Sequence, residues 1–285
     1  MRNYVLLILF FLGTTLPLLA QTEDIYHSVN EGTIIGVGGY NLKDTYLSPG
    51  EDMKYGGWGL RVLNERMKLL KLADGQISRQ QIFSVDVATT SNPASTANNL
   101  AGFVDYTLAY HYRFQILPEL KILTGASAHG MLGFIYNTRN GNNPASAKMD
   151  IDLNISALAI YSFKIKDYPL TVRYQMEIPF SGVLFSPHKL QSYYEIFSQG
   201  NTSGIIKYNS FHNKFAIKNY LTVDFPVANY TVRAGYLGSY YYTDVNEIQS
   251  HIISNSFMLG IVKEFVSFGG KRAQRNANKL NSAYY

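Results

Sequence analysis

The sequence predicts an all-β fold, a transmembrane antiparallel β-barrel of about ten strands. Three observations predict it: an N-terminal secretory signal, stretches in which apolar and polar residues alternate, and connections that alternate between short and long. In LTVRYQMEIPF, residues 170–180, every second side chain is apolar. A strand there has one apolar and one polar face. An apolar face toward lipid and a polar face toward a narrow interior are typical of an outer-membrane barrel.

Residues 1–20 are predicted to be a secretory signal peptide. Arg2 precedes the apolar run VLLILFFLG, and Leu18-Leu19-Ala20 leads into the polar stretch QTED, with cleavage expected after Ala20. No later stretch offers the roughly 18 uncharged apolar residues that a transmembrane helix needs. Strands must therefore make any membrane crossing, and we expect the exported chain to reside in the bacterial outer membrane.

Alternation and turn residues together predict ten strands. In VDYTLAYHYRFQI, for example, Val104 to Ile116 place apolar side chains opposite Asp105, His111 and Arg113. An even count brings both ends of the barrel to the same side of the membrane. Within 182–210, SYYEIFS is compatible with a short helix and SGIIKYN with another strand, so twelve strands is the alternative. The ten strands are expected near residues 32–42, 56–70, 80–90, 102–116, 119–136, 148–165, 169–181, 210–225, 229–242 and 250–268.

The connections between these strands fall into two classes. Short turns rich in turn-forming residues are expected at 73–76, 117–118, 166–169 and 226–229. Longer polar connections are expected at about 43–55, 90–101, 137–147, 182–210 and 243–250. This segregation predicts short periplasmic turns and longer extracellular loops. The barrel is assigned to residues 21–270, and residues 271–285 are expected to form a basic, disordered periplasmic tail.

Composition narrows the classes of partner. The sequence has no cysteine, which excludes disulfides, thiolate metal sites and an N-terminal lipid anchor. The net charge of +5 comes from Arg2 and four basic residues of the tail, so residues 21–270 are formally neutral. A pI near 9.1 therefore does not indicate nucleic-acid binding. The predicted partners are outer-membrane lipid, the barrel-assembly machinery during biogenesis and an unidentified loop ligand.

The polar faces of the predicted strands carry charges of both signs in nearly equal number. A barrel of about ten strands encloses little more than its own side chains. We therefore expect the charges to pair across the lumen and to block it. The predicted lumen charges are Arg61, Glu65, Asp86, Asp105, Arg113, Lys121, Asp152, Arg173, Glu177, Lys218, Asp224 and Arg233.

One set of residues suggests acyl-transfer chemistry. Ser127 and His129 share a predicted inward face with Asp105 on the neighbouring strand, and serine, histidine and carboxylate are the components of a hydrolase site. The spacing of Ser127 and His129 is one that chance readily produces, and a bilayer lipid does not reach an inward face. We therefore expect lumen residues bonded to their neighbours, and the chain is more readily explained as a non-enzyme.

The sequence predicts no metal or cofactor site. Isolated histidines lack a second ligand at close spacing. The loop DTYLSPGED contains Asp44, Glu51 and Asp52 but lacks the ligand spacing of a calcium loop, so a solvated acidic turn is expected. The histidines concerned are His27, His188, His212 and His251.

Four stretches, DTYLSP, YGGWGLRVLNERMK, FHNKFAIKNYLTVDFP and YLGSYYYTDVN, together resemble an uncharacterised family of outer-membrane β-barrel proteins from Bacteroides-type bacteria. The resemblance covers nearly all of the mature chain and implies a location and a fold. It brings no known substrate and no functional residue. Three functions follow in order of preference: a structural or ligand-binding barrel that displays its loops, a passage for small solutes or lipids, and an outer-membrane lipid hydrolase.

Overall fold

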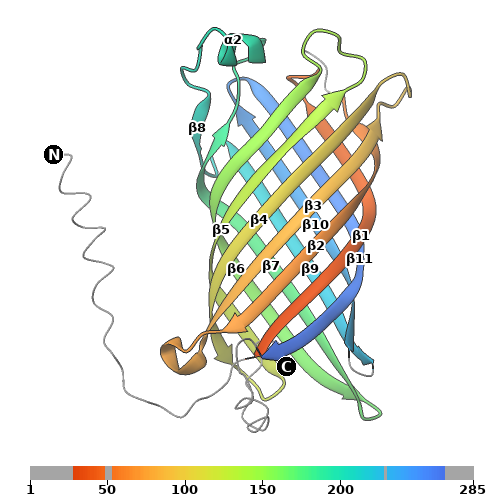
Figure 1. Cartoon of the computed structure of the whole chain (residues 1–285), viewed down its shortest axis with the longest axis vertical. Helices are drawn as coiled ribbons and strands as arrows, with labels where there is room; N and C mark the ends of the chain where they lie inside the picture. The colour runs from red at the N-terminus through yellow and green to blue at the C-terminus, as the bar shows by residue number, and fades with distance from the viewer. Residues whose placement is uncertain (1–27, 49–52, 228–229, 267–285) are drawn as a thin grey trace, which may run out of the picture.

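Ten long antiparallel strands pair in sequence order to form a closed barrel (Figure 1). The computed structural model describes residues 28–48, 53–227 and 230–266. The barrel closes where β1 pairs with β11, from Ser28↔Val266 to Asp44↔Ser250, and β6 pairs with β7. The strands are β1 (Ser28–Asp44), β2 (Tyr55–Leu69), β3 (Ile77–Ser91), β4 (Asn98–Gln115), β5 (Leu120–Asn137), β6 (Ala145–Ile165), β7 (Tyr168–Phe185), β9 (Lys214–Val227), β10 (Tyr230–Val245) and β11 (Ile248–Val266).

The predicted all-β barrel of ten strands is confirmed. Each strand is longer than the roughly 9–11 residues that a tilted transmembrane strand requires. Among the described residues, no helix has the length and apolar character needed to cross a membrane. The signal peptide assigned to 1–20 and the tail assigned to 271–285 lie outside the described residues.

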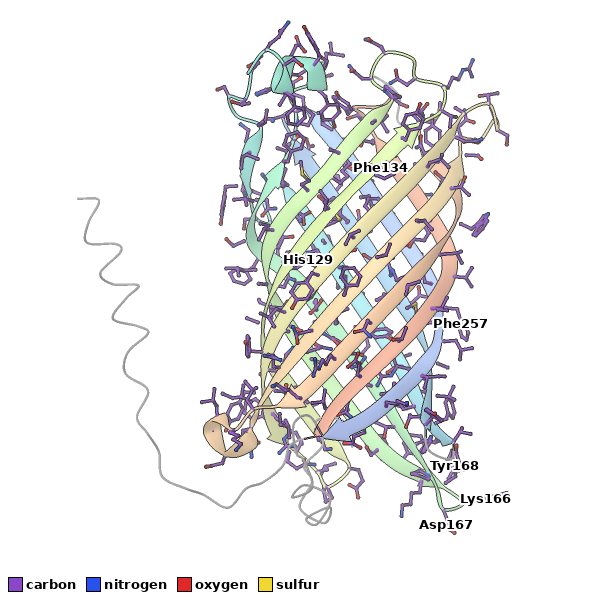
Figure 2. All side chains as sticks on the ribbon, viewed as in Figure 1. His129, Phe134, Lys166, Asp167, Tyr168 and Phe257 are labelled. Carbon is purple, nitrogen blue, oxygen red and sulfur yellow. The ribbon has the colours of Figure 1, made fainter. Side chains whose placement is uncertain are left out.

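The two ends of the barrel differ in the length of their connections. At the turn end, the 3-10 helix η1 (Leu72–Gly75) and the two-residue turn Lys166-Asp167 join neighbouring strands, and β1 begins and β11 ends there. At the loop end lie the connections 45–54, 92–97, 138–144 and 186–213. The predicted segregation holds for the two-residue turn Lys166-Asp167 and for the connections 45–54 and 186–213, whereas the turn-end connection 70–76 is as long as 138–144 and longer than 92–97. Figure 2 labels Lys166, Asp167 and Tyr168 at the turn end.

One predicted loop is wrong. In place of a long connection at 243–250, β10 and β11 pair as far as Val245↔Ile248, and only Asn246 and Glu247 form the turn. Both residues have positive φ, 54° and 61°, as the type I′ hairpin turn requires. The two strands continue to pair here beyond the residues whose outer side chains are apolar. The polar composition of the segment therefore wrongly predicts a loop.

The hairpin at Asn246-Glu247 carries a stability prediction. Glu247→Gly removes the Cβ from a left-handed position, and we expect it to raise the free energy of unfolding by about 1 kcal/mol. The contact that is lost is small, because Glu247 lies 3.8 Å from Lys189 and its side chain is 80% exposed. Urea unfolding of the folded barrel in detergent measures the change. Glu247→Ala is the control and gives no gain; equal effects of Gly and Ala would contradict the assignment of the turn.

The connection between β7 and β9 contains both elements that its sequence suggests. The helix α2 (Tyr193–Phe197) begins at Ser192, whose side chain accepts a bond from the Glu195 backbone N–H in a capping box. The short strand β8 (Ile206–Asn209) pairs with β7 from Gly182↔Asn209 to Phe185↔Ile206. Because β8 takes no part in closure, the twelve-strand alternative is wrong.

The two faces of the wall differ as the alternation predicts. All ten barrel strands carry large apolar side chains that are at least a third exposed on the outside, such as Phe134 and Phe257 (Figure 2). The interior is lined by buried polar and charged side chains, such as His129 and Arg173. The predicted faces are thus confirmed for these strands, and the interior is where chemistry must be sought.

Candidate functional site

A layer of ion pairs crosses the lumen in the half of the barrel nearer the turn end. Glu65 accepts two bonds from Arg173, Nη1–Oε1 at 2.5 Å and Nη2–Oε2 at 2.8 Å, and a third from Arg233 at 2.7 Å. Arg233 also binds Asp224 through two bonds of 2.7 Å. We call this set, with its neighbours Gln80 and Gln175, the closing layer. Its six side chains are at most 2% exposed.

The closing layer reaches from wall to wall. The strands β2, which carries Glu65, and β7, which carries Arg173, are five strands apart in either direction around the ring. A direct ion pair between them therefore spans the diameter. Gln80 on β3 strengthens the crossing by bonding both Glu65, at 2.5 Å, and Gln175 on β7, at 2.8 Å. Two negative and two positive charges meet here, so the layer is neutral.

A second, apolar layer lies between the closing layer and the turn end. It consists of Met67 and Leu69 from β2, Leu123 from β5, and Leu158 and Ile160 from β6, each at most 2% exposed. Two of the predicted lumen charges, Arg113 and Lys121, are half-buried, and in the strand registers they stand opposite Leu123 and Ile160 of this layer. They lie apart from the closing layer.

The loop-end half of the lumen contains a cavity, here called the upper chamber. The Arg61–Asp86 pair forms part of its wall, with Nε–Oδ1 at 2.6 Å. Glu177 also lines it and accepts bonds from Ser127 and Gln175. A second cavity lies toward the closing layer and is lined by Gln175 of that layer. Four charged residues line both cavities: Arg61, Asp105, Glu177 and Lys218.

Of the three residues with acyl-transfer potential, the structure brings two together. His129 Nε2 lies 2.8 Å from Asp105 Oδ1 and 3.0 Å from Lys218 Nζ. Ser127 instead contacts Glu177 at 3.4 Å and accepts a bond from Asn154 at 3.1 Å. The serine is therefore not placed for activation by the histidine, as a hydrolase requires.

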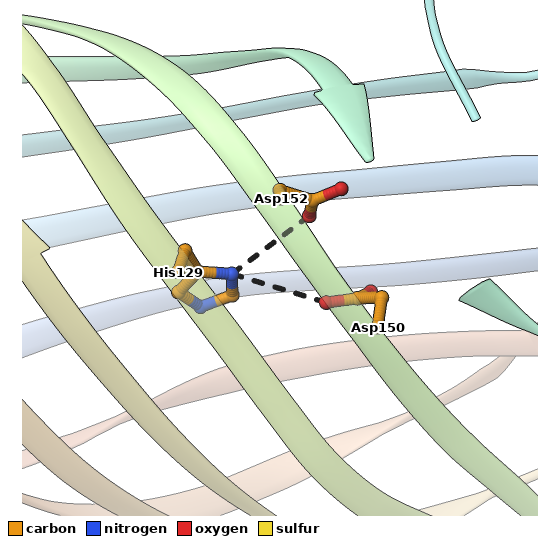
Figure 3. Close-up of side chains that lie close together, drawn as sticks. All are labelled: His129, Asp150 and Asp152. Carbon is orange, nitrogen blue, oxygen red and sulfur yellow. Dashed lines mark ion pairs between the residues drawn. The ribbon is translucent and has the colours of Figure 1, made fainter. Parts of the chain in front are cut away.

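Beside His129 lies a cluster that the predicted residues include only in part. Asp150 and Asp152 on β6 lie 3.9 Å and 3.8 Å from His129 Nδ1 (Figure 3). Lys214 of β9 binds both carboxylates, at 2.9 Å and 2.5 Å. Asp152 was predicted as a lumen charge, whereas Asp150 and Lys214 were not. Asp150 is two residues from Asp152 on β6, and Lys214 is four residues from Lys218 on β9. Because side chains alternate along a strand, these spacings place both residues on the same inward face as the predicted charges.

A register shift in the wall makes room for Asp152. The pairing of β6 with β7 slips between Leu153 and Asn154, opposite the segment that contains Gly182. A Cβ at Gly182 would lie 2.3 Å from Asp152 Oδ1 and 2.6 Å from Asn209 Oδ1. Glycine is therefore required there for Asn209 to donate to Asp152, at 3.1 Å.

The loop end is built around Asp44 and two tyrosines. Asp44 is buried and pairs with Lys148 at 2.7 Å, so the expectation of a solvated acidic turn is wrong for Asp44; Glu51 and Asp52 lie outside the described residues. Burial, with Tyr193 and Asp44 nearby, raises the pKa of the Tyr46 phenol. Its ring meets Tyr193 edge-on at 5.6 Å. The chain 186–213 is thereby fixed over the barrel mouth.

Helix α2 presents different chemistry on its two sides. Ile196 is buried against Phe185 and Ile205, whereas Tyr194 and Phe197 are 66% and 71% exposed. Bonds from the Ser192 backbone N–H and hydroxyl lower the pKa of the Glu195 carboxyl and fix the start of the helix. An ordered loop thus displays aromatic rings to the outside.

Comparison with known proteins gives a family and a set of barrels. The family described as "Protein of unknown function (DUF3316)" matches residues 4–272. The transport unit of the autotransporter AIDA-I from Escherichia coli is 10% identical, with 93% of this chain and 98% of that chain covered and a TM-score of 0.49. The outer membrane protease OmpT from Escherichia coli is 10% identical, with 87% and 99% covered and a TM-score of 0.46. No curated protein matches the chain.

Proposed function

We propose the following function for this chain, which belongs to the DUF3316 family of proteins of unknown function: it is a closed outer-membrane barrel that does not conduct solutes and that binds a ligand through its loop end. The observation that carries the proposal is the closing layer, in which Glu65 and Arg173 meet across the full diameter. A Bacteroides-type origin stays a prediction.

The exterior supports a membrane location. Large apolar side chains are exposed on all ten strands. Soluble monomers, in contrast, rarely expose contiguous apolar patches larger than a few hundred Å². Lipid is the solvent in which such a surface is stable, and in the closed ring each of the ten barrel strands pairs with both of its neighbours. With the short turns in the periplasm, the loops that carry α2 face the outside of the cell.

The interior supports a closed barrel. Opening a path would break the bonds of Glu65 to Arg173 and Arg233 and leave buried charges unpaired, at a cost of several kcal/mol. The apolar layer of Met67, Leu123 and Leu158 would then have to part as well. Passage of small solutes or lipids is therefore the second choice. A lipid hydrolase is third, because Ser127 is separated from the His129 pair and lies inside the wall.

The loop end supports binding. The chain 186–213 is the longest connection, and it is anchored by the Tyr46–Tyr193 contact and by the capped α2. Anchoring reduces the entropy that a binding loop would lose. Exposed Tyr194 and Phe197 offer the aromatic contact area that binding surfaces favour.

Planar-bilayer recordings test the closed barrel. We expect the folded protein to give no discrete conductance steps, because the closing and apolar layers block the lumen in series. Co-flotation with lipid vesicles and faster migration of the unheated band establish that the recorded protein is inserted. Reproducible steps from such a preparation would overturn the proposal and favour the passage function.

A further inference from the structure

We propose that the upper chamber contains a binding site for a divalent first-row transition-metal cation, held by His129, Asp150 and Asp152. The three side chains come from adjacent strands, His129 from β5 and the two aspartates from β6 (Figure 3). One ligand atom from each lies within 4.8 Å of the others, and all three residues are buried. The site concerns the chamber above the closing layer, so it is separate from loop binding and from conductance.

The distances suit a metal after a small contraction. His129 Nδ1 is 3.9 Å from an Asp150 oxygen and 3.8 Å from an Asp152 oxygen. Ligands about 2.1 Å from a zinc ion are about 3.4 Å apart in a tetrahedral arrangement. Both histidine–carboxylate pairs must therefore approach by a few tenths of an ångström, and the two carboxylate oxygens, which lie within 4.8 Å of each other, must converge on the same point.

One carboxylate oxygen of the cluster, Asp150 Oδ1, is directed toward His129 without a hydrogen bond. The Asp150 side chain is 0% exposed; Lys214 binds its Oδ2 and the Tyr241 hydroxyl also interacts with this carboxylate, whereas Oδ1 itself makes no hydrogen bond in the distances recorded among the described residues. This oxygen is the one directed toward His129 Nδ1. A buried carboxylate oxygen without a partner is costly, and a cation between Asp150 and His129 would satisfy it.

His129 is held as metal-binding histidines are. Its Nε2 lies 2.8 Å from Asp105, and in the tautomer that donates to this carboxylate the Nδ1 lone pair faces Asp150 and Asp152. A carboxylate behind the imidazole fixes the ring and raises its basicity. Lys218 Nζ lies 3.2 Å from the same Asp105 oxygen and 3.0 Å from His129 Nε2. Asp105 is therefore a positioning residue.

The charge around the chamber favours a dication. Once Arg61 is paired with Asp86, four carboxylates face two ammonium groups among the described residues in and beside the wall. The carboxylates are Asp105, Asp150, Asp152 and Glu177, and the ammonium groups are Lys214 and Lys218. Two positive charges restore neutrality in a medium where unbalanced charge is expensive. An imidazole ligand selects Zn²⁺, Co²⁺ or Ni²⁺ over Ca²⁺ and Mg²⁺.

Lys214 is the competitor for this site. Its ammonium bonds both carboxylates and lies 4.8 Å from the ring centre of Tyr241. Metal binding must displace or share these bonds, so removal of the amine is expected to strengthen binding. A purely structural cluster of ion pairs instead predicts that the unmodified chain, in which Lys214 neutralises both carboxylates, binds no Zn²⁺.

Zinc binding to the full chain tests the site. The protein is refolded in detergent, stripped with a chelator and titrated with Zn²⁺ by equilibrium dialysis and elemental analysis, with the heat-modifiable band as the check on folding. We expect one Zn²⁺ per chain, at least about tenfold weaker binding in His129→Gln and Asp150→Asn, and about 10–100-fold weaker binding in Asp105→Asn. Lys214→Met is expected to bind at least about tenfold tighter.

The matched control is His111→Gln, which removes a buried histidine that contacts Ser156 at 2.9 Å, away from the cluster. It is expected to bind Zn²⁺ as the unmodified chain does. In addition, Co²⁺ bound to the site should give visible d–d absorption that is lost in His129→Gln. The proposal is overturned if the unmodified chain does not bind one Zn²⁺, or if His129→Gln binds Zn²⁺ as tightly as the unmodified chain. Conductance plays no part in these outcomes.

Discussion

Glu65→Gln is expected to lower the free energy of unfolding by about 3–5 kcal/mol. Glu65 is the shared partner of Arg173 and Arg233, and all three side chains are 1% exposed. The amide keeps the shape of the carboxylate but removes its charge. The change removes a carboxylate that pairs with both Arg173 and Arg233, while Arg233 keeps its ion pair with Asp224. Equilibrium unfolding by urea in detergent, followed by tryptophan fluorescence of Trp58, measures the loss.

The matched control for Glu65→Gln is Glu31→Gln, on the outer face. Glu31 lies 4.0 Å from Arg66, and both side chains are 38% exposed. Its removal should change stability by less than about 1 kcal/mol. If the two variants lose the same stability, the closing layer does not hold the barrel together as described.

A double-mutant cycle measures the interaction energy between Glu65 and Arg173. Arg173→Met alone leaves Glu65 bound to Arg233, and in combination with Glu65→Gln it leaves the neutral Arg233–Asp224 pair. The double variant should therefore be more stable than the sum of the single losses predicts, by up to about 3 kcal/mol. Additive losses would mean that Glu65 and Arg173 act independently.

The face of each residue was predictable from sequence, because it depends only on the period of two along a strand. Arg173 and Tyr174 are adjacent in the chain, and the structure places the first in the closing layer and the second outside, 42% exposed. The partners across the lumen were not predictable in the same way. Glu65 and Arg173 are 108 positions apart, and their meeting depends on the register of every strand between them.

The cluster beside His129 shows where sequence reasoning ended too early. Alternation is clearest where the outer face of a strand is apolar, which is from Ile151 and from Phe215 onward; the expected strands 148–165 and 210–225 contain Asp150 and Lys214, but neither was named as a lumen charge. Asp150 and Lys214 each precede these residues by one position, still on the inner face. The same cause produced the loop wrongly expected at 243–250. Strands that extend beyond the apolar band continue to pair, while their outer residues become polar.

The partner of His129 was correctly anticipated, because it is set by a single hairpin. In the β4–β5 register His129 is opposite Thr107, and Asp105 is its diagonal neighbour on the same face. Diagonal neighbours across an antiparallel pair are within reach of long side chains. Ser127 shares that face, yet bonds with Glu177 of β7, which no local pattern indicates.

Phe257→Arg is expected to lower the free energy of unfolding in lipid by about 2–4 kcal/mol, because an arginine on the lipid face near the bilayer centre loses its hydration. Phe257 is 61% exposed on β11 and lies in the apolar band (Figure 2). Urea unfolding of the barrel in lipid vesicles measures the change.

The matched control is Phe197→Arg, an equally large change at a side chain that is 71% exposed on α2, above the band. Water surrounds this position if the loops lie outside the membrane, so the change should be within about 0.5 kcal/mol. A large difference between the two variants can arise only if their surroundings differ, since both phenylalanines are exposed. Equal losses would mean that the apolar band does not meet lipid, and the membrane location would then be wrong.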